Sequence, residues 1–264
     1  MRIWIVGMTI AAASWGAAHA QEASYKEKTA ALLKVLGKKN AKVEEVTDCI
    51  DAVADGYAEA SDKEKEAGIK AIGKAAKSKD KDVVLGAFEA LGLLQAPGTG
   101  KYLKRHLSIP KKGPYTKLQK VALETAKEIG DKSILGQLRK LADHKLDEVA
   151  VDATEALGGY KRLPVKDRKA LAIGLITRLQ KLSVVSGGSR GYGRGLAEST
   201  AEKTEETGTP DGRIGSDGKA DGRRTKLYSA TRAALCDLTD QRFAEVGDWV
   251  GWAKDAKAKK DPFG

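Results

Sequence analysis

The sequence contains few of the residues from which catalytic and metal sites are built. It has two cysteines and three histidines, and one of the histidines, His19, lies in the first twenty residues. Zinc sites need cysteines or histidines at short paired spacings, and covalent catalysis needs a nucleophile with a base beside it. Neither pattern occurs, and no serine elbow or catalytic carboxylate pair stands out. We therefore expect no enzymatic activity, no metal and no cofactor.

Long apolar runs are also lacking beyond the N-terminus. An apolar run from Ile3 to Ala13 follows Arg2, and small residues follow it at Ala18-His19-Ala20. The run is much shorter than the roughly 20 residues that span a bilayer. This arrangement is typical of a secretory signal peptide. We expect residues 1–20 to be removed and the mature chain, without a transmembrane segment, to be exported to the periplasm or secreted.

Acidic residues are fewer than basic ones, with 36 Asp and Glu against 47 Lys and Arg and a formal net charge of +11. Only one of the basic residues, Arg2, belongs to the expected signal peptide. A positive surface attracts anionic partners. For an exported protein, these are acidic proteins or anionic polymers such as wall polysaccharide and extracellular nucleic acid.

A repeated pattern of small and apolar residues runs through the middle of the chain. Each copy has Val, then Ala or Thr, then Leu or Ile before a glycine, and the glycines Gly92, Gly130 and Gly158 lie 38 and 28 residues apart. The copies comprise Val83, Val84, Ala87, Ala90 and Leu91; Val121, Ala122, Thr125 and Ile129; and Val149, Ala150, Ala153, Ala156 and Leu157. The register continues backwards to residues 46–54 and forwards to residues 227–236. Periods of this size are typical of stacked helical hairpins.

The pattern predicts an all-α fold, a right-handed α-solenoid of four or five helical hairpins. Residues 21–185 are expected to hold a capping helix, Tyr25–Gly37, and four hairpins. The hairpins pair Lys42–Ala54 with Asp62–Ala76, Asp82–Leu94 with Thr99–Leu107, Tyr115–Ile129 with Lys132–Asp143, and Leu146–Leu157 with Val165–Val184.

The C-terminal part of the chain is predicted to divide in two. Residues 186–226, in which 10 glycines occur, are expected to form a flexible insertion. Residues 227–264 are expected to form a terminal hairpin and a tail, with helices over Leu227–Leu238 and Phe243–Lys257. Trp249 and Trp252 are expected to seal the end of the stack.

Over about residues 42–182 the repeats resemble the short HEAT-like repeats of bacterial proteins, including the phycobilin-lyase type. Asp82-Val83-Val84 and Asp147-Glu148-Val149 approximate the typical start of such a repeat, without the arginine that usually follows. The ending Leu238-Thr239-Asp240-Gln241 and the tryptophans after it resemble the close of some exported bacterial HEAT-repeat proteins. The resemblance implies a binding role in which the second helices of the hairpins line the concave side of the solenoid.

The strongest candidate site is a basic run without any Asp or Glu between residues 101 and 120. Its members are Lys101, Lys104, Arg105, Lys111, Lys112, Lys117 and Lys120. On a helix, the first three share one face, while Tyr102, Leu103, His106 and Leu107 pack inward. We expect this run to bind an acidic protein partner. An anionic polymer is the alternative ligand, and a solvated surface that serves solubility is the alternative role.

Two further features have ordinary interpretations. Residues 97–101 look like part of a phosphate-binding loop, but Gln95 and Tyr102 stand where such a loop needs a glycine and a hydroxyl, so we interpret the segment as a hairpin turn. Cys49 and Cys236 fall at buried positions of the repeat and are expected to be free thiols, because an extended stack would hold them apart.

Overall fold

The structure, a computed structural model, describes residues 23–184 and 217–263. Within these two ranges the secondary structure is entirely helical, as predicted. The helices of the first range are α1 (Tyr25–Leu36), α2 (Val43–Asp55), α3 (Asp62–Ala75), α4 (Lys81–Leu94), α5 (Gly100–Leu103), α6 (Lys117–Ile129), α7 (Lys132–Ala142), α8 (Asp147–Ala156), the 3-10 helix η1 (Leu157–Arg162) and α9 (Val165–Val184). The second range holds α10 (Asp217–Thr239) and α11 (Val246–Ala258).

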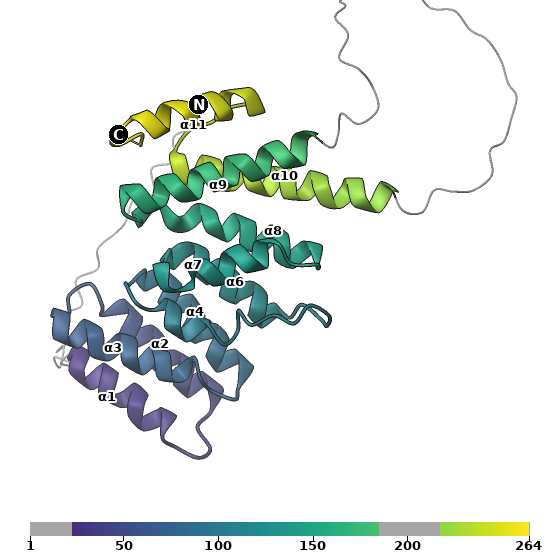
Figure 1. Cartoon of the computed structure of the whole chain (residues 1–264). Coiled ribbons are helices and arrows are strands. Elements are labelled where there is room, and N and C mark those ends of the chain that lie inside the picture. The colour runs from purple at the N-terminus through teal and green to yellow at the C-terminus, as the bar shows by residue number, and fades with distance from the viewer. Residues whose placement is uncertain (1–22, 185–216, 264) are drawn as a thin grey trace, which may run out of the picture.

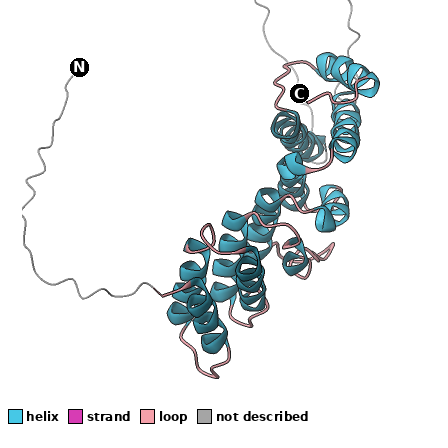
Figure 2. Ribbon diagram, turned by 90° about the vertical axis from the view of Figure 1, so that its left-hand side faces the viewer, coloured by secondary structure: helices cyan, strands magenta, loops and turns pink. Residues whose placement is uncertain are grey.

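The helices follow one another along an elongated stack that runs from α1 to α11 (Figure 1). One row consists of α2, α4, α6, α8 and α10, each packed against the next. On the other side, α1 packs against α3, α5 against α7, and α9 against α11. Figure 2, a quarter turn away, shows the same progression with many helices seen nearly end-on. The hydrophobic core is therefore continuous along the stack.

The repeated residues lie where neighbouring helices of the first row touch. Ala87, Thr125 and Ala153 take the same position in the three copies and are buried in α4, α6 and α8, and the hydroxyl of Thr125 donates to the carbonyl of Phe88 in α4. A Cβ atom added to Gly92 would lie 2.0 Å from a carboxylate oxygen of Glu128 in α6. The small residues of the repeat therefore mark positions where neighbouring helices of the row pack closely.

The predicted pairing of helices into hairpins is corrected, together with two predicted helix boundaries. The consecutive helices that pack together most extensively are α1 with α2, α3 with α4, α7 with α8 and α9 with α10, so the pairs are shifted by one helix from the predicted hairpins. The second helix of the second hairpin, expected over Thr99–Leu107, is a single α-helical turn, α5. Beyond it, the amide of His106 donates to the carbonyl of Leu103 with the tighter spacing of a 3-10 turn, and Pro110 follows shortly after. The chain still turns through residues 104–107, but not as a regular helix.

The other corrected boundary is the start of α10. Residues 217–226, expected to belong to the insertion, form its first turns. Arg223 donates to the carbonyls of His144 and Lys145 and to the carboxylate of Asp147, and Arg224 donates to the carbonyl of Leu182. These contacts attach the start of α10 to the stack. The rest of the expected insertion, and the expected signal peptide, lie outside the described residues.

The remaining features concern the ends of the stack. Trp249 of α11 is fully buried, as predicted, and packs edge-to-face on Phe243 with ring centroids 4.9 Å apart. Cys49 and Cys236 are free thiols, as predicted, but they are half-buried and not buried as their places in the repeat suggested. Among the described helices, none combines the length and the apolar composition needed to cross a bilayer.

Candidate functional site

Buried apolar residues hold the first part of the basic run in place. Leu103 and Leu107 are fully buried, and His106 packs edge-on against the ring of Phe88, with centroids 5.1 Å apart. Lys104 and Arg105, with Lys101 before them, are exposed. The predicted division into an inward apolar side and an outward basic side is therefore present, although it rests on an irregular turn. We call Lys101, Lys104 and Arg105 the basic turn.

Hydrogen bonds join the basic turn to α7. The amide of Gly100 donates to a carboxylate oxygen of Asp131, just before α7, at 2.9 Å. Farther along, the side-chain amide of Gln137 in α7 donates to the carbonyl of Lys104 at 3.2 Å. The turn is thus fastened at both ends. In a phosphate-binding loop, backbone amides such as that of Gly100 would donate to the phosphate. Here the amide of Gly100 donates to Asp131, which agrees with our interpretation of residues 97–101 as a hairpin turn.

Lys111 and Lys112 lie on the loop that leads from the basic turn to α6. Both are exposed. On one side of them, the carbonyl of Pro110 lies 3.2 Å from Nε2 of His144. On the other, the hydroxyl of Tyr115 donates to the carboxylate of Asp152 in α8 at 2.8 Å. The loop is therefore attached to the stack on both sides of the two lysines.

Lys117 and Lys120 have a different setting from the basic turn. They lie in the first turns of α6 and line a hollow of about 370 Å³ between α6 and α8, together with the acidic side chains of Glu148 and Asp152. Lys226 also lines the hollow, so three cations and two carboxylates face it. The structure does not gather the seven residues of the run into one patch: it divides them among the basic turn, the loop and this mixed-charge hollow.

All seven residues are exposed, and none forms an ion pair with another residue of the described ranges. Other basic side chains of the stack are engaged in such pairs, as Lys132 is with Asp167 and Arg223 with Asp147. The ammonium of Lys101 lies over the ring of Tyr102, 5.1 Å from its centroid. Charges that form no ion pair remain available to a ligand, because no such pair must break first.

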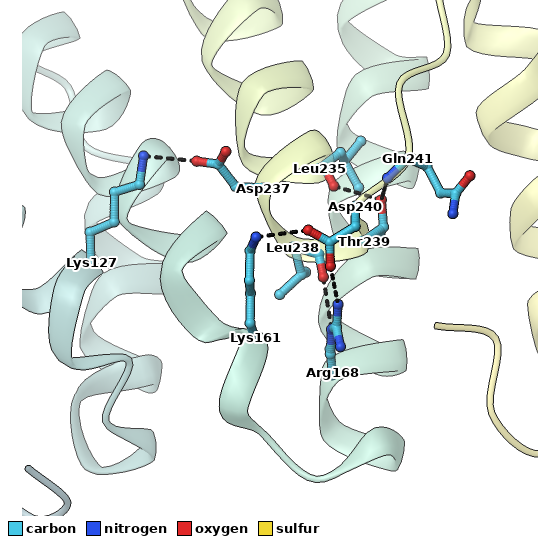
Figure 3. Close-up of polar contacts among 9 residues, drawn as sticks. All are labelled: Lys127, Lys161, Arg168, Leu235, Asp237, Leu238, Thr239, Asp240 and Gln241. Atoms are coloured by element: carbon cyan, nitrogen blue, oxygen red, sulfur yellow. Dashed lines mark hydrogen bonds and ion pairs between the residues drawn. The ribbon is translucent and has the colours of Figure 1, made fainter. Parts of the chain in front are cut away.

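The segment Leu238–Gln241 has a structural role (Figure 3). The carboxylate of Asp240 accepts from Lys161 at 2.8 Å and from Arg168 at 3.3 Å, and Arg168 also donates to the carbonyl of Leu238 at 2.7 Å. The bond from Lys161 is the largest cause that lowers the pKa of Asp240. These contacts fasten the end of α10 to η1 and α9, and nothing in their geometry indicates a ligand.

Sequence reasoning missed one surface, an open groove between α7 and α9. It has a volume of about 610 Å³ and is lined mainly by apolar atoms. Arg139 of α7 and Lys181 of α9 stand on its rim. The run of small residues that α9 shows toward the groove is visible in the sequence, but the separation of α7 from α9 is not.

Neither metal-ligating groups among the described residues nor similar proteins add information about the site. Within the described ranges, no group of three or more metal-ligating side chains comes together. The fold and the site define an all-helical protein with an exposed basic turn. No protein-family model matches the chain, and a comparison with curated proteins found no relative.

Proposed function

We propose that this protein is an exported, non-enzymatic binding scaffold, a right-handed α-solenoid of HEAT-like hairpins whose basic turn binds an acidic protein partner. The observation that carries the proposal is the basic turn itself. Lys101, Lys104 and Arg105 are exposed and free of ion pairs within the described ranges, and the turn is fastened to α7 at both ends.

The packing of the helices supports a solenoid. Each helix of the row α2, α4, α6, α8 and α10 contacts the next in chain order, and the repeated residues lie at these contacts. Proteins built in this way offer a long surface for their size, and their usual role is binding. The sequence pattern put the basic run on the second helix of a hairpin, which would line the concave side of a HEAT-like solenoid, but α5 packs with α6 and α7 and so takes the place of a first helix.

The charge distribution favours an acidic protein over an anionic polymer. A polyanion binds best along a continuous track of cations, where many counterions are released. Here the carboxylates of Glu148 and Asp152 line the same hollow as Lys117, Lys120 and Lys226, so the cations of this part do not form an uninterrupted track. A compact group of three cations fits a local acidic patch better, since its geometry is fixed and its reach is short.

A pull-down from the envelope fraction of the host tests the proposal. The bait is the chain from residue 21 onward, compared with its double variant Lys104→Glu, Arg105→Glu. We expect a discrete acidic protein that the wild-type chain captures and the variant loses. Lys117→Glu, Lys120→Glu is the matched control, because it makes the same charge change in the hollow beside α8 and is expected to keep the partner.

The dependence of capture on salt concentration distinguishes an acidic protein from an anionic polymer. Capture of heterogeneous polymer that disappears steeply between low and high salt would replace the acidic protein by the polyelectrolyte. Equal capture by the wild-type chain and the basic-turn variant would remove the basic turn from the function. Circular dichroism of each variant verifies that the charge changes leave the helices folded.

A further inference from the structure

We propose that the groove between α7 and α9 is a second docking site, which takes an acidic amphipathic segment of a protein partner. The inference rests on the proposed binding role of the chain, but it concerns other residues than the basic turn. The groove is therefore tested by substitutions that leave Lys101, Lys104 and Arg105 untouched.

The groove exists because the second row of helices is interrupted at this point. The 3-10 helix η1 lies between α8 and α9 in the chain, and both α7 and α9 pack against it rather than closely against each other. Long side chains bridge the separation. Lys132 pairs with Asp167 at 2.6 Å near the start of both helices, and Arg178 pairs with Asp143 at 2.7 Å near the end of α7.

The wall that α9 contributes is formed by small side chains. Ala170, Gly174 and Thr177 succeed one another on the same face of the helix and line the groove. A Cβ atom added to Gly174 would meet nothing within 4 Å. A larger side chain at residue 174 would therefore meet no clash.

The floor of the groove is apolar. It is formed by the buried side chains of Ala142, Leu157, Leu171 and Leu175. The lining residues of α9 extend from Ala170 to Leu182, which corresponds to about 18 Å along the helix axis. A length of three helical turns suits a protein segment with apolar anchors at helical spacing. A small molecule fits less well, because the groove is open to solvent and small ligands prefer sites that enclose them.

The charges on the rim of the groove favour a negatively charged partner. The only acidic side chain among the lining residues, Asp143, is already paired with Arg178. Arg139 and Lys181 have no ion pair within the described ranges. Carboxylates that flank the apolar anchors of a ligand would meet these two cations. A second copy of this chain is disfavoured, because its net charge of +11 brings more positive charge to a positive rim.

A displayed library of random peptides of about 16 residues, selected on the chain from residue 21 onward, tests the inference. We expect enriched peptides with apolar residues three and four positions apart and with Glu or Asp between them. Gly174→Leu fills the groove without a clash and is expected to weaken these peptides about tenfold or more. Gly136→Leu is the matched control, since Gly136 is a helical glycine of α7 that also has open space at its Cβ and does not line the groove.

The outcomes are distinct. Selective loss of acidic amphipathic peptides in Gly174→Leu, with binding kept in Gly136→Leu and in Lys104→Glu, Arg105→Glu, would establish the groove as the site. Enrichment of basic peptides, no enrichment, or equal binding by Gly174→Leu would overturn the inference. So would a concentration-dependent dimer, seen by sedimentation, that Gly174→Leu abolishes. Peptides lost only in the basic-turn variant would support the proposed function and not the groove.

Discussion

Gly159 of η1 lies against the backbone of Lys127 in α6, so close that a Cβ atom on Gly159 would be 1.8 Å from the Lys127 carbonyl oxygen. Neither side of this contact is a flexible side chain. The contact joins the 3-10 helix, which separates α7 from α9, to the first row of helices.

Gly159→Ala is therefore expected to lower the free energy of unfolding by about 2–3 kcal/mol, because the backbones of η1 and α6 must move apart. Urea unfolding followed by circular dichroism measures the change. Gly174→Ala serves as the control, since it has free space at Cβ and an alanine favours a helix, so its stability should rise by about 0.5–1 kcal/mol. Equal stabilities of the two variants would contradict the close contact at Gly159.

Arg168 and Asp240 should contribute unequally, although they form one ion pair. The side chain of Arg168 is 14% exposed, and it also donates to the carbonyl of Leu238 and lies over the ring of Phe263, 4.0 Å from its centroid. The side chain of Asp240 is 61% exposed. We expect Arg168→Ala to cost about 2–3 kcal/mol in unfolding free energy and Asp240→Asn less than about 1 kcal/mol.

The same urea experiment separates these two effects. Asparagine is a suitable replacement because residue 240 has a positive φ of 60°, which Asn tolerates. If Asp240→Asn destabilised the protein as much as Arg168→Ala, the charge of Asp240, which pairs with both Lys161 and Arg168, would be the main contribution, and the contacts of Arg168 with Leu238 and Phe263 would not dominate.

The all-helical fold could be predicted because the pattern of small and apolar residues that indicates it is local and recurs along the sequence. Ala87, Thr125 and Ala153 recur at one position of the repeat and are buried in α4, α6 and α8, where a helix contact requires a small residue at each step. The start of α10 could not be predicted, since it depends on bonds from Arg223 to the carbonyls of His144 and Lys145, nearly 80 residues earlier. The glycine-rich composition of residues 186–226 predicted a flexible insertion, because contacts with residues so distant in the chain leave no local pattern in the sequence.

The candidate site was predicted in part. The alternation of Leu103 and Leu107 with Lys104 and Arg105 correctly indicated which side chains are buried. The uniform sign of the run suggested one patch, but the acids that face its second half come from α8, including Asp152, more than 30 residues later. The groove was invisible for a similar reason, because it follows from the packing of α7 and α9 on η1.

His106 should make the stability depend on pH. Burial, and secondly the charge of Arg105, lowers the pKa of His106 below its usual 6.5. Below about pH 6.5 the unfolded chain therefore takes up a proton that the folded protein resists, so this group lowers the unfolding free energy as the pH falls from 7 to 5. In His106→Gln, which has no such proton to bind, the loss of stability over this interval should be smaller.

Urea unfolding at several pH values measures this difference between the wild-type chain and His106→Gln. Loss of the contact with Phe88 shifts the whole curve of the variant by a constant amount, whereas the proton linkage changes its slope. Parallel curves between pH 5 and 7 would show that His106 titrates alike in the folded and unfolded chain.

Tyr115 should control the loop that bears Lys111 and Lys112. Its hydroxyl donates to Asp152 at 2.8 Å, and burial, followed by this bond, raises the pKa of Tyr115 above its usual value, so the phenol remains a donor throughout the neutral range. Tyr115→Phe leaves the ring in place and removes the donor, at a cost of about 1–3 kcal/mol in unfolding free energy, because Asp152 loses its partner.

Amide hydrogen exchange distinguishes a local effect from a global one. In Tyr115→Phe, we expect exchange to become faster in residues 108–116, while the basic turn, which is fastened to α7 by Gly100 and Gln137, keeps its protection. A double-mutant cycle with Asp152→Asn should show coupling between the two positions. If the cycle gave no coupling and exchange stayed unchanged, the bond would not hold the loop, and Lys111 and Lys112 would owe their positions to other contacts.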